Sequence, residues 1–210
     1  LTPLFGAALT LTAGRRRRMQ IAIASLSMVV SLGVAVTLLL AVQTTGQPLV
    51  MQVGGWAAPF GISLVVDRLS ALMVVITSIV LLAVMVFSIG QGNVDHADED
   101  TEEETPVSIF YPTYLVLAAG VYNAFIAGDL FNLYVGFEIL LVASFVLITL
   151  GGTVTRIRAG VTYIIVSLVS SVLFLIAIAM IFAATGTVNM ATISARVLSL
   201  IHISERAGKA

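Results

Sequence analysis

The sequence contains no cysteine, and only 10% of its 210 residues are charged. Without cysteine the chain forms no disulfide, no thiolate metal site and no cysteine-ligated iron–sulfur cluster. Soluble domains carry roughly 25% charged residues, so this composition argues against a water-soluble fold. The two histidines, His96 and His202, lie far apart without a second ligand at metal spacing. We therefore expect no bound metal and no cofactor.

Lysine is nearly absent too, since the only one is Lys209, close to the last residue. The net charge of -1 gives no indication of nucleic-acid binding. The sequence shows no nucleotide-binding loop, no nucleophile–base pair and no cofactor motif. We therefore expect a protein that is not an enzyme.

Hydrophobic residues make up 59% of the chain, and its mean hydropathy is +1.10. A bilayer core about 30 Å thick is crossed by about 20 apolar residues in a helix, and several uninterrupted runs reach this length. The sequence therefore predicts an all-α fold, a polytopic bundle of transmembrane helices.

Apolar runs and the turn residues between them divide the chain into about six membrane segments, the first one truncated. A truncated first helix and a basic cytoplasmic loop occupy 1–18, and the five complete spans are predicted at 19–42, 67–90, 109–126, 129–150 and 159–184. The loops on the outer side are a hairpin-like loop at 43–66 and a loop at 185–197. The loops on the cytoplasmic side are an acidic loop at 91–108 and a basic loop at 151–158. The orientation follows from the arginines at 15–18, 156 and 158, because positive residues in short loops stay in the cytoplasm.

The last residues form a separate segment. Residues 198–204 read LSLIHIS, which is also the translation of a transposase end sequence used in sequencing libraries. We predict that 198–210 is a non-native tail, so its charged residues carry no functional weight.

One carboxylate, Glu138, lies deep in a predicted span. At a rise of about 1.5 Å per residue it lies about 13 Å along the helix from Asp129, near the midplane of the bilayer. A charged carboxylate there costs about 2.5–3.5 kcal/mol, so such residues are by default functional. Glu138 is therefore a candidate proton-translocation site. The alternative is a static hydrogen bond between helices.

Two further carboxylates lie at the starts of spans. Asp129 stands where a helix needs an N-cap, and Asp67, followed by Arg68, lies at an interface. Each carboxylate either caps or anchors its helix or loads ions at the outer mouth.

Tyr163, Ser167, Ser170 and Phe174 follow a spacing of four, three and four residues, which places them on one helix face. Serines at such positions either allow close packing between helices or line a polar path.

Three stretches of the sequence share a likeness to one family. They are GGWAAPFGISLVVDRLSALMV at 54–74, GDLFNLYVGFEILLVASFVLITLGG at 128–152 and ATGTVNMATISARV at 184–197. In these stretches the chain resembles the D-type subunits of the Mrp-type multisubunit cation/proton antiporters. The same superfamily includes the antiporter-like membrane subunits of respiratory complex I.

The resemblance implies a full-length protein of about fourteen helices with inverted repeats, of which this N-terminal fragment would hold about six. It also implies that Glu138 works with a lysine on the seventh helix. The implied function is that of a membrane subunit of a monovalent cation (Na+)/proton antiporter in the cell membrane of a bacterium or archaeon. Its expected partners are the other subunits of a hetero-oligomeric complex, the lipid bilayer, H+ and Na+ or another monovalent cation.

Two other functions stay open. One is an antiporter-like, proton-pumping membrane subunit of a respiratory NADH:quinone oxidoreductase. The other is a structural membrane subunit with no ion path, in which Glu138 only ties helices together.

Overall fold

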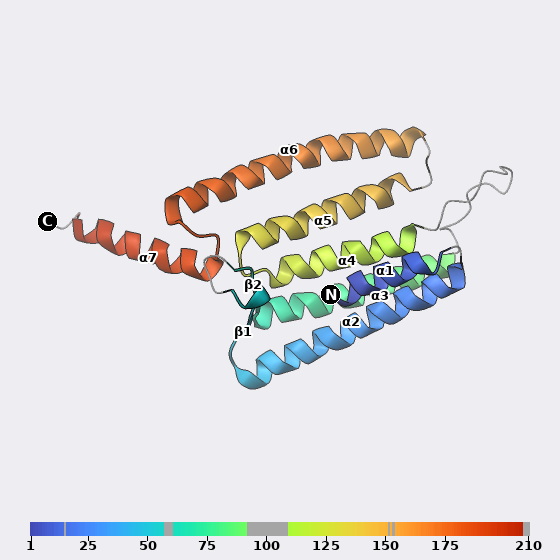
Figure 1. Cartoon of the computed structure of the whole chain (residues 1–210), viewed down its shortest axis with the longest axis horizontal. Helices are drawn as coiled ribbons and strands as arrows, with labels where there is room; N and C mark the ends of the chain where they lie inside the picture. Colours follow the sequence, from blue (N-terminus) through green and yellow to red (C-terminus); the bar gives the residue numbers. More distant parts are fainter. Residues whose placement is uncertain (15, 57–60, 92–108, 151, 153, 208–210) are drawn as a thin grey trace.

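A computed structural model describes residues 1–14, 16–56, 61–91, 109–150, 152 and 154–207 (Figure 1). Within these ranges the chain is almost entirely helical. The elements are α1 (Thr2–Thr12), α2 (Arg17–Thr45), β1 (Leu49–Gln52), a 3-10 turn η1 (Val53–Gly55), β2 (Ser63–Val66), α3 (Arg68–Gln91), α4 (Phe110–Ile126), α5 (Leu130–Thr149), α6 (Val154–Thr185) and α7 (Met190–Ala207). The predicted acidic loop, apart from residue 91, lies outside the described residues, as do Arg15 and residues 208–210.

The all-α membrane bundle predicted from hydropathy is confirmed. Among the described residues, α2, α3, α5 and α6 are long and apolar enough to cross a membrane, and α1 and α4 are shorter apolar helices. Long apolar helices satisfy their own backbone hydrogen bonds, which is what a lipid environment requires of a spanning segment.

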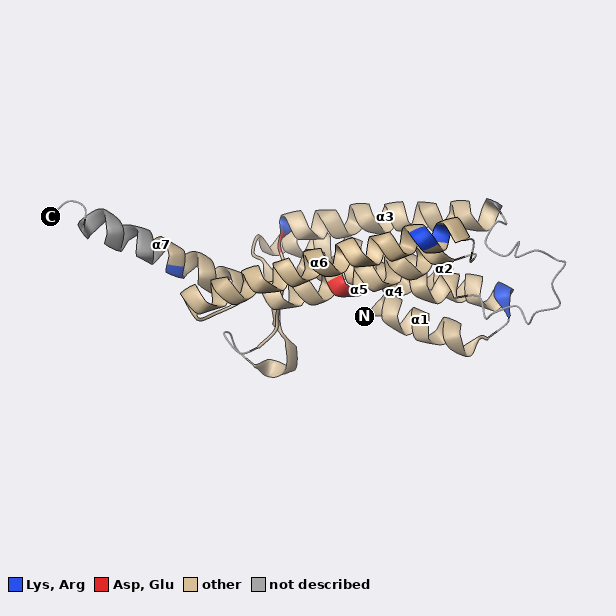
Figure 2. Ribbon diagram, turned by 90° about the horizontal axis from the view of Figure 1, so that it is seen from above, with Lys and Arg blue, Asp and Glu red and all other residues tan. Residues whose placement is uncertain are grey.

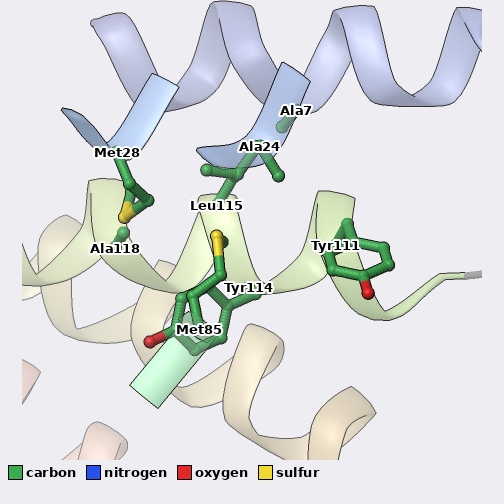
Figure 3. Packing of buried hydrophobic residues seen from close by; sticks show 8 residues of the cluster. All are labelled: Ala7, Ala24, Met28, Met85, Tyr111, Tyr114, Leu115 and Ala118. Carbon is green, nitrogen blue, oxygen red and sulfur yellow. The ribbon is translucent and has the colours of Figure 1, made fainter. Parts of the chain in front are cut away.

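Helix α4 forms the centre of the bundle, since it contacts α1, α2, α3 and α5 (Figure 1). Its buried side chains meet those of three neighbouring helices in one apolar cluster (Figure 3). The cluster consists of Ala7, Ala24, Met28, Met85, Tyr111, Tyr114, Leu115 and Ala118. The hydroxyl of Tyr114 donates to the backbone oxygen of Leu81 at 2.7 Å, which satisfies its polar atom inside the cluster.

Glycines bring α4 and α5 into close contact. A Cβ atom at Gly136 would lie 3.1 Å from the backbone nitrogen of Ala124, and one at Gly120 would lie 3.0 Å from that of Leu140. Small residues at helix crossings allow this approach in membranes, where packing rather than water exclusion holds helices together. The α4–α5 pair therefore forms a tight wall.

The turns of the bundle lie at two opposite ends. The antiparallel strands β1 and β2, the α4–α5 turn and the α6–α7 turn lie at one end, and the α1–α2 and α5–α6 turns lie at the other (Figure 1). The starts of α2 and α6 carry arginines and lie at this second end (Figures 1 and 2). The predicted orientation requires these two helix starts to lie on the same side of the membrane. Which end of the bundle is cytoplasmic stays a prediction.

Two predicted loops differ from the structure. Helix α6 begins at Val154, so most of the basic loop predicted at 151–158 is helical, and Arg156 folds back to donate to Leu150 O at 2.7 Å. The loop predicted at 185–197 becomes helix α7 from Met190 onward. The reason is an N-cap that was not predicted from the sequence, because Asn189 Oδ1 accepts from the Thr192 backbone N–H at 3.1 Å.

Candidate functional site

Glu138 lies near the middle of α5, on the face that packs against α6. It is partly buried. The hydroxyl of Ser171, on α6, donates to Glu138 Oε1. Ser171 itself is only 9% exposed, whereas the hydrogen bond as a whole is partly buried. The structure thus gives the deep carboxylate a neutral donor from the neighbouring helix.

Aromatic rings close the site on the side toward the start of α5. The Tyr134 hydroxyl oxygen lies 3.1 Å from Ser171 Oγ, one helical turn before Glu138. The ring of Phe174 packs edge-on against Tyr134 and Phe137, with centroids 6.0 Å and 5.9 Å away. Edge-to-face contacts of this kind are favourable and orient the rings, so the Tyr134 hydroxyl is held beside Ser171.

A partly open pocket of about 150 Å³ lies on the other side of Glu138. It extends toward the end of α5 and the first half of α6, the end at which Arg156 and Arg158 lie. Its lining residues are Glu138, Leu141, Val142, Phe145, Tyr163, Ile164, Ser167, Leu168 and Ser171. The lining is mostly apolar, with the carboxylate and three hydroxyl groups as its polar members, and the volume is sufficient for several water molecules.

The predicted polar stripe on α6 falls partly on this pocket. Tyr163 and Ser167 line it, whereas Ser170 is exposed and its hydroxyl donates to Val166 O in its own helix at 2.9 Å. Ser171 occupies the place beside Glu138. Residues three and four positions along a helix are both compatible with one face, so spacing alone did not separate Ser170 from Ser171. Only the packing of α6 against α5 shows which of the two serines lies beside Glu138.

Asp129 is the N-cap of α5 and is 2% exposed. Its Oδ1 accepts from the Asn132 backbone N–H at 2.7 Å, and its Oδ2 accepts from that of Ser63 at 3.3 Å. Both oxygens are therefore engaged by backbone amides, which accounts for the burial of the carboxylate.

Asp67 precedes α3 in a reciprocal cap. Its Oδ1 accepts from the Ser70 backbone N–H at 2.7 Å, and the Asp67 N–H donates to Ser70 Oγ at 2.8 Å. This is the arrangement of a capping box, and both Asp67 and Arg68 are exposed. Among the described residues no group of three His, Cys, Asp or Glu could hold a metal ion.

Around Asp129 the chain forms a polar junction, defined here by Ser63, Gly128, Asp129 and Asn189. The Gly128 N–H donates to Ser63 O at 2.8 Å, and Gly128 O accepts from Met190 N–H at 3.0 Å. Asn189 Nδ2 donates to Ser63 Oγ at 3.1 Å. The junction thus ties β2, the α4–α5 turn and the α6–α7 turn together.

The polar junction contains residues from each of the three stretches that resemble one family. The stretch 54–74 supplies Ser63, 128–152 supplies Gly128 and Asp129, and 184–197 supplies Asn189. They lie far apart in the sequence and meet at one end of the bundle. This convergence was not visible from spacing.

Comparison with known proteins finds a family and several relatives. The profile of the NADH:quinone oxidoreductase/Mrp antiporter transmembrane family matches residues 127–207, which include α5, α6 and the site. The D subunit of the Na(+)/H(+) antiporter of Alkalihalophilus pseudofirmus is 41% identical over 148 residues. That alignment covers 70% of this chain but only 28% of the relative, so the chain spans less than a third of that protein's length.

Two solved structures share the fold. A chain of the Mrp complex from Dietzia sp. DQ12-45-1b superposes with a TM-score of 0.78 at 30% identity, covering 89% of this chain and 34% of that one. A chain of the membrane-bound sulfane sulfur reductase, an archaeal respiratory membrane complex, superposes with a TM-score of 0.77 at 26% identity, covering 91% and 38%.

Proposed function

This chain belongs to the NADH:quinone oxidoreductase/Mrp antiporter family of multi-pass membrane proteins, and from that premise we propose that it works as a subunit of a monovalent cation/proton antiporter. The likeness to the D subunit of an Na(+)/H(+) antiporter and to a chain of an Mrp complex supports this proposal. The transport activity belongs to the full-length protein with its partner subunits in the cell membrane, and the exchanged ions are H+ and Na+ or another monovalent cation.

Glu138 is the proposed proton-translocation site. The supporting observation is a carboxylate half-way along a membrane helix that has a hydroxyl donor on one side and a pocket on the other. A carboxylate in this position is costly when ionised, and the donor from Ser171 lowers that cost only in part. A carboxylate in this setting is suited to take up a proton and pass it on, which is the role we propose for Glu138.

The pocket provides the proton path to Glu138. Tyr163 and Ser167 line it together with the carboxylate and supply polar partners for water between apolar walls. The path leads toward the end of the bundle at which Arg156 and Arg158 lie. Asp129 and Asp67 are assigned as helix caps, because their oxygens accept from backbone amides.

The test is the substitution Glu138→Gln in the full-length complex, with dye-reported cation/proton exchange in everted vesicles. Glutamine keeps the size of the side chain and one acceptor oxygen for Ser171 but does not ionise, so exchange is expected to fall to background while the complex assembles normally. Glu138→Asp is the matched control and should retain part of the exchange. Unchanged exchange in Glu138→Gln would leave only the structural role for this residue.

A second function has one observation in its favour. The fold is shared with a chain of an archaeal respiratory membrane complex, so a subunit that moves protons in a redox-driven complex is the alternative. The same substitution would then stop proton pumping that depends on electron transfer, and cation/proton exchange without electron transfer would be absent from the unmodified complex.

A further inference from the structure

We propose that Ser171 is a positioning residue for Glu138, whose hydroxyl sets how firmly Glu138 holds its proton and links the carboxylate to Tyr134. This proposal rests on the assignment of Glu138 as the proton site. It adds Ser171 and Tyr134 to that site as residues that act through the carboxylate.

Glu138 Oε1, Ser171 Oγ and the Tyr134 hydroxyl oxygen form a row of hydrogen bonds that can run in either of two directions. A hydroxyl has one proton to donate. Ser171 Oγ lies within hydrogen-bond distance of both Glu138 Oε1 and, at 3.1 Å, the Tyr134 hydroxyl oxygen. When Glu138 is ionised, the Ser171 proton goes to the carboxylate, so the Tyr134 hydroxyl has to be the donor to Ser171 Oγ. When Glu138 is protonated, its own O–H donates to Ser171 Oγ, and Ser171 donates to Tyr134. Both hydroxyl groups rotate and no O–H bond breaks, so the proton itself arrives from the pocket.

Packing holds both partners in place. Ser171 is 9% exposed on the α5-facing side of α6, and the ring of Phe174 packs against Tyr134. Ser170, the preceding residue, is exposed and bonds within its own helix. Two serines that are adjacent in the sequence thus have opposite surroundings, and only one of them reaches the carboxylate.

Apart from Glu138 itself, the parts of the described helices that lie next to Glu138 carry no charged side chain. Helix α4 carries tyrosines as its only titratable residues, Tyr111, Tyr114 and Tyr122, and the Tyr114 hydroxyl donates to Leu81 O on α3. The charged residues of α6 are confined to Arg156 and Arg158 in its first turns, where Arg156 donates to Leu150 O. The titratable residue that α6 places at the pocket is Tyr163, and Tyr134 is the tyrosine of α5.

A neutral donor therefore has a large influence on this carboxylate. A hydrogen bond to an ionised carboxylate is about twice as strong as one between neutral groups. The donor from Ser171 favours the ionised form of Glu138 and is lost when the hydroxyl is removed. Ser171→Ala is therefore expected to change the pH dependence of exchange.

The experiment is the pH profile of cation/proton exchange by the full-length complex carrying Ser171→Ala. The profile is expected to move toward higher pH by about one unit, whereas Ser171→Thr, which keeps a hydroxyl, stays close to the unmodified profile. The matched control is Ser170→Ala, which removes the same group one residue away and leaves the profile unchanged. Equal profiles for Ser171→Ala and the unmodified complex would overturn the proposal.

A second variant keeps the test decisive if Ser171→Ala fails to assemble. Tyr134→Phe removes the hydroxyl that supports Ser171 and should move the profile in the same direction by a smaller amount, while an unmoved profile would count against the row of hydrogen bonds. The proton site at Glu138 and the role of Ser171 are refuted by different results. Exchange that survives in Glu138→Gln refutes the proton site, whereas loss in Glu138→Gln with no shift in Ser171→Ala refutes only the role of Ser171.

Discussion

The two faces of helix α5 are built in opposite ways. The face toward α4 has Gly136 in close contact with the α4 backbone, and Asn132 and Asn123 exchange side-chain hydrogen bonds of 3.2 and 3.3 Å. The face toward α6 has Glu138, with a donor from Ser171, beside a pocket of about 150 Å³. One face is filled and its polar groups are paired, and the other leaves room beside a carboxylate.

This difference indicates that the two faces of α5 have separate roles. A polar group that is fully paired between packed helices adds rigidity, and the α4 face holds α5 in a fixed position. A carboxylate with a neutral partner and space for water can change its protonation state without moving the helix. Substitutions on each face test whether the two roles are separate in this sense.

The largest expected effect comes from filling the tight face. Gly136→Leu would place side-chain atoms where the Ala124 nitrogen lies 3.1 Å from a Cβ position. Overpacking costs about 1–3 kcal/mol, and more where the neighbour is backbone. We expect a large loss of assembled full-length complex, measured by its yield and its thermal midpoint after purification in detergent.

The matched control for this change is Gly33→Leu on α2, where a Cβ atom would meet nothing within 4 Å. It adds the same side chain to an open surface and should leave the yield near that of the unmodified complex. Equal losses in both variants would show that the contact between α4 and α5 is not what limits assembly.

A smaller effect is expected on the open face. Ser167→Ala removes one polar group from the pocket wall and leaves the packing of α5 against α4 intact. A hydrogen bond contributes about 0.5–1.5 kcal/mol, so exchange by the full-length complex should slow by about two- to ten-fold, with a normal assembled yield. Vesicle exchange rates at saturating cation give this comparison, with Ser170→Ala as the variant that should retain the full rate.

A thermal midpoint that falls in Ser167→Ala as far as in Gly136→Leu would mean that both faces of α5 carry stability. An unchanged rate in Ser167→Ala would remove the pocket from the proton path.

The apolar helices of the bundle, and the place of Glu138 near the middle of one of them, could be predicted from the sequence, because hydropathy and charge along the chain are local properties. The depth of Glu138 in the membrane stays a prediction. Glu138 stands out in an apolar run whatever surrounds it. The choice of Ser171 over Ser170 could not be predicted, since one residue rotates a side chain by about 100° and the neighbouring helix decides which one is used. The polar junction was hidden for a similar reason, because it joins residues from three distant segments.

The helix that begins after Asn189 was missed for a local reason. The residues TGTVN have the composition of a loop, and they conceal the cap that Asn189 provides to Thr192. Asn directly before a possible first helical turn is a usable N-cap signal. The prediction gave more weight to the polar composition of the segment than to this N-cap signal.

The central claim is that Glu138 gains and loses a proton inside the membrane. Infrared difference spectra of the full-length complex between low and high pH record protonated carboxylic acids directly. We expect a carboxylic acid band that disappears at high pH in the unmodified complex and is missing from the Glu138→Gln spectrum. Spectra of the two proteins that carry the same pH-dependent carboxylic acid bands would contradict it.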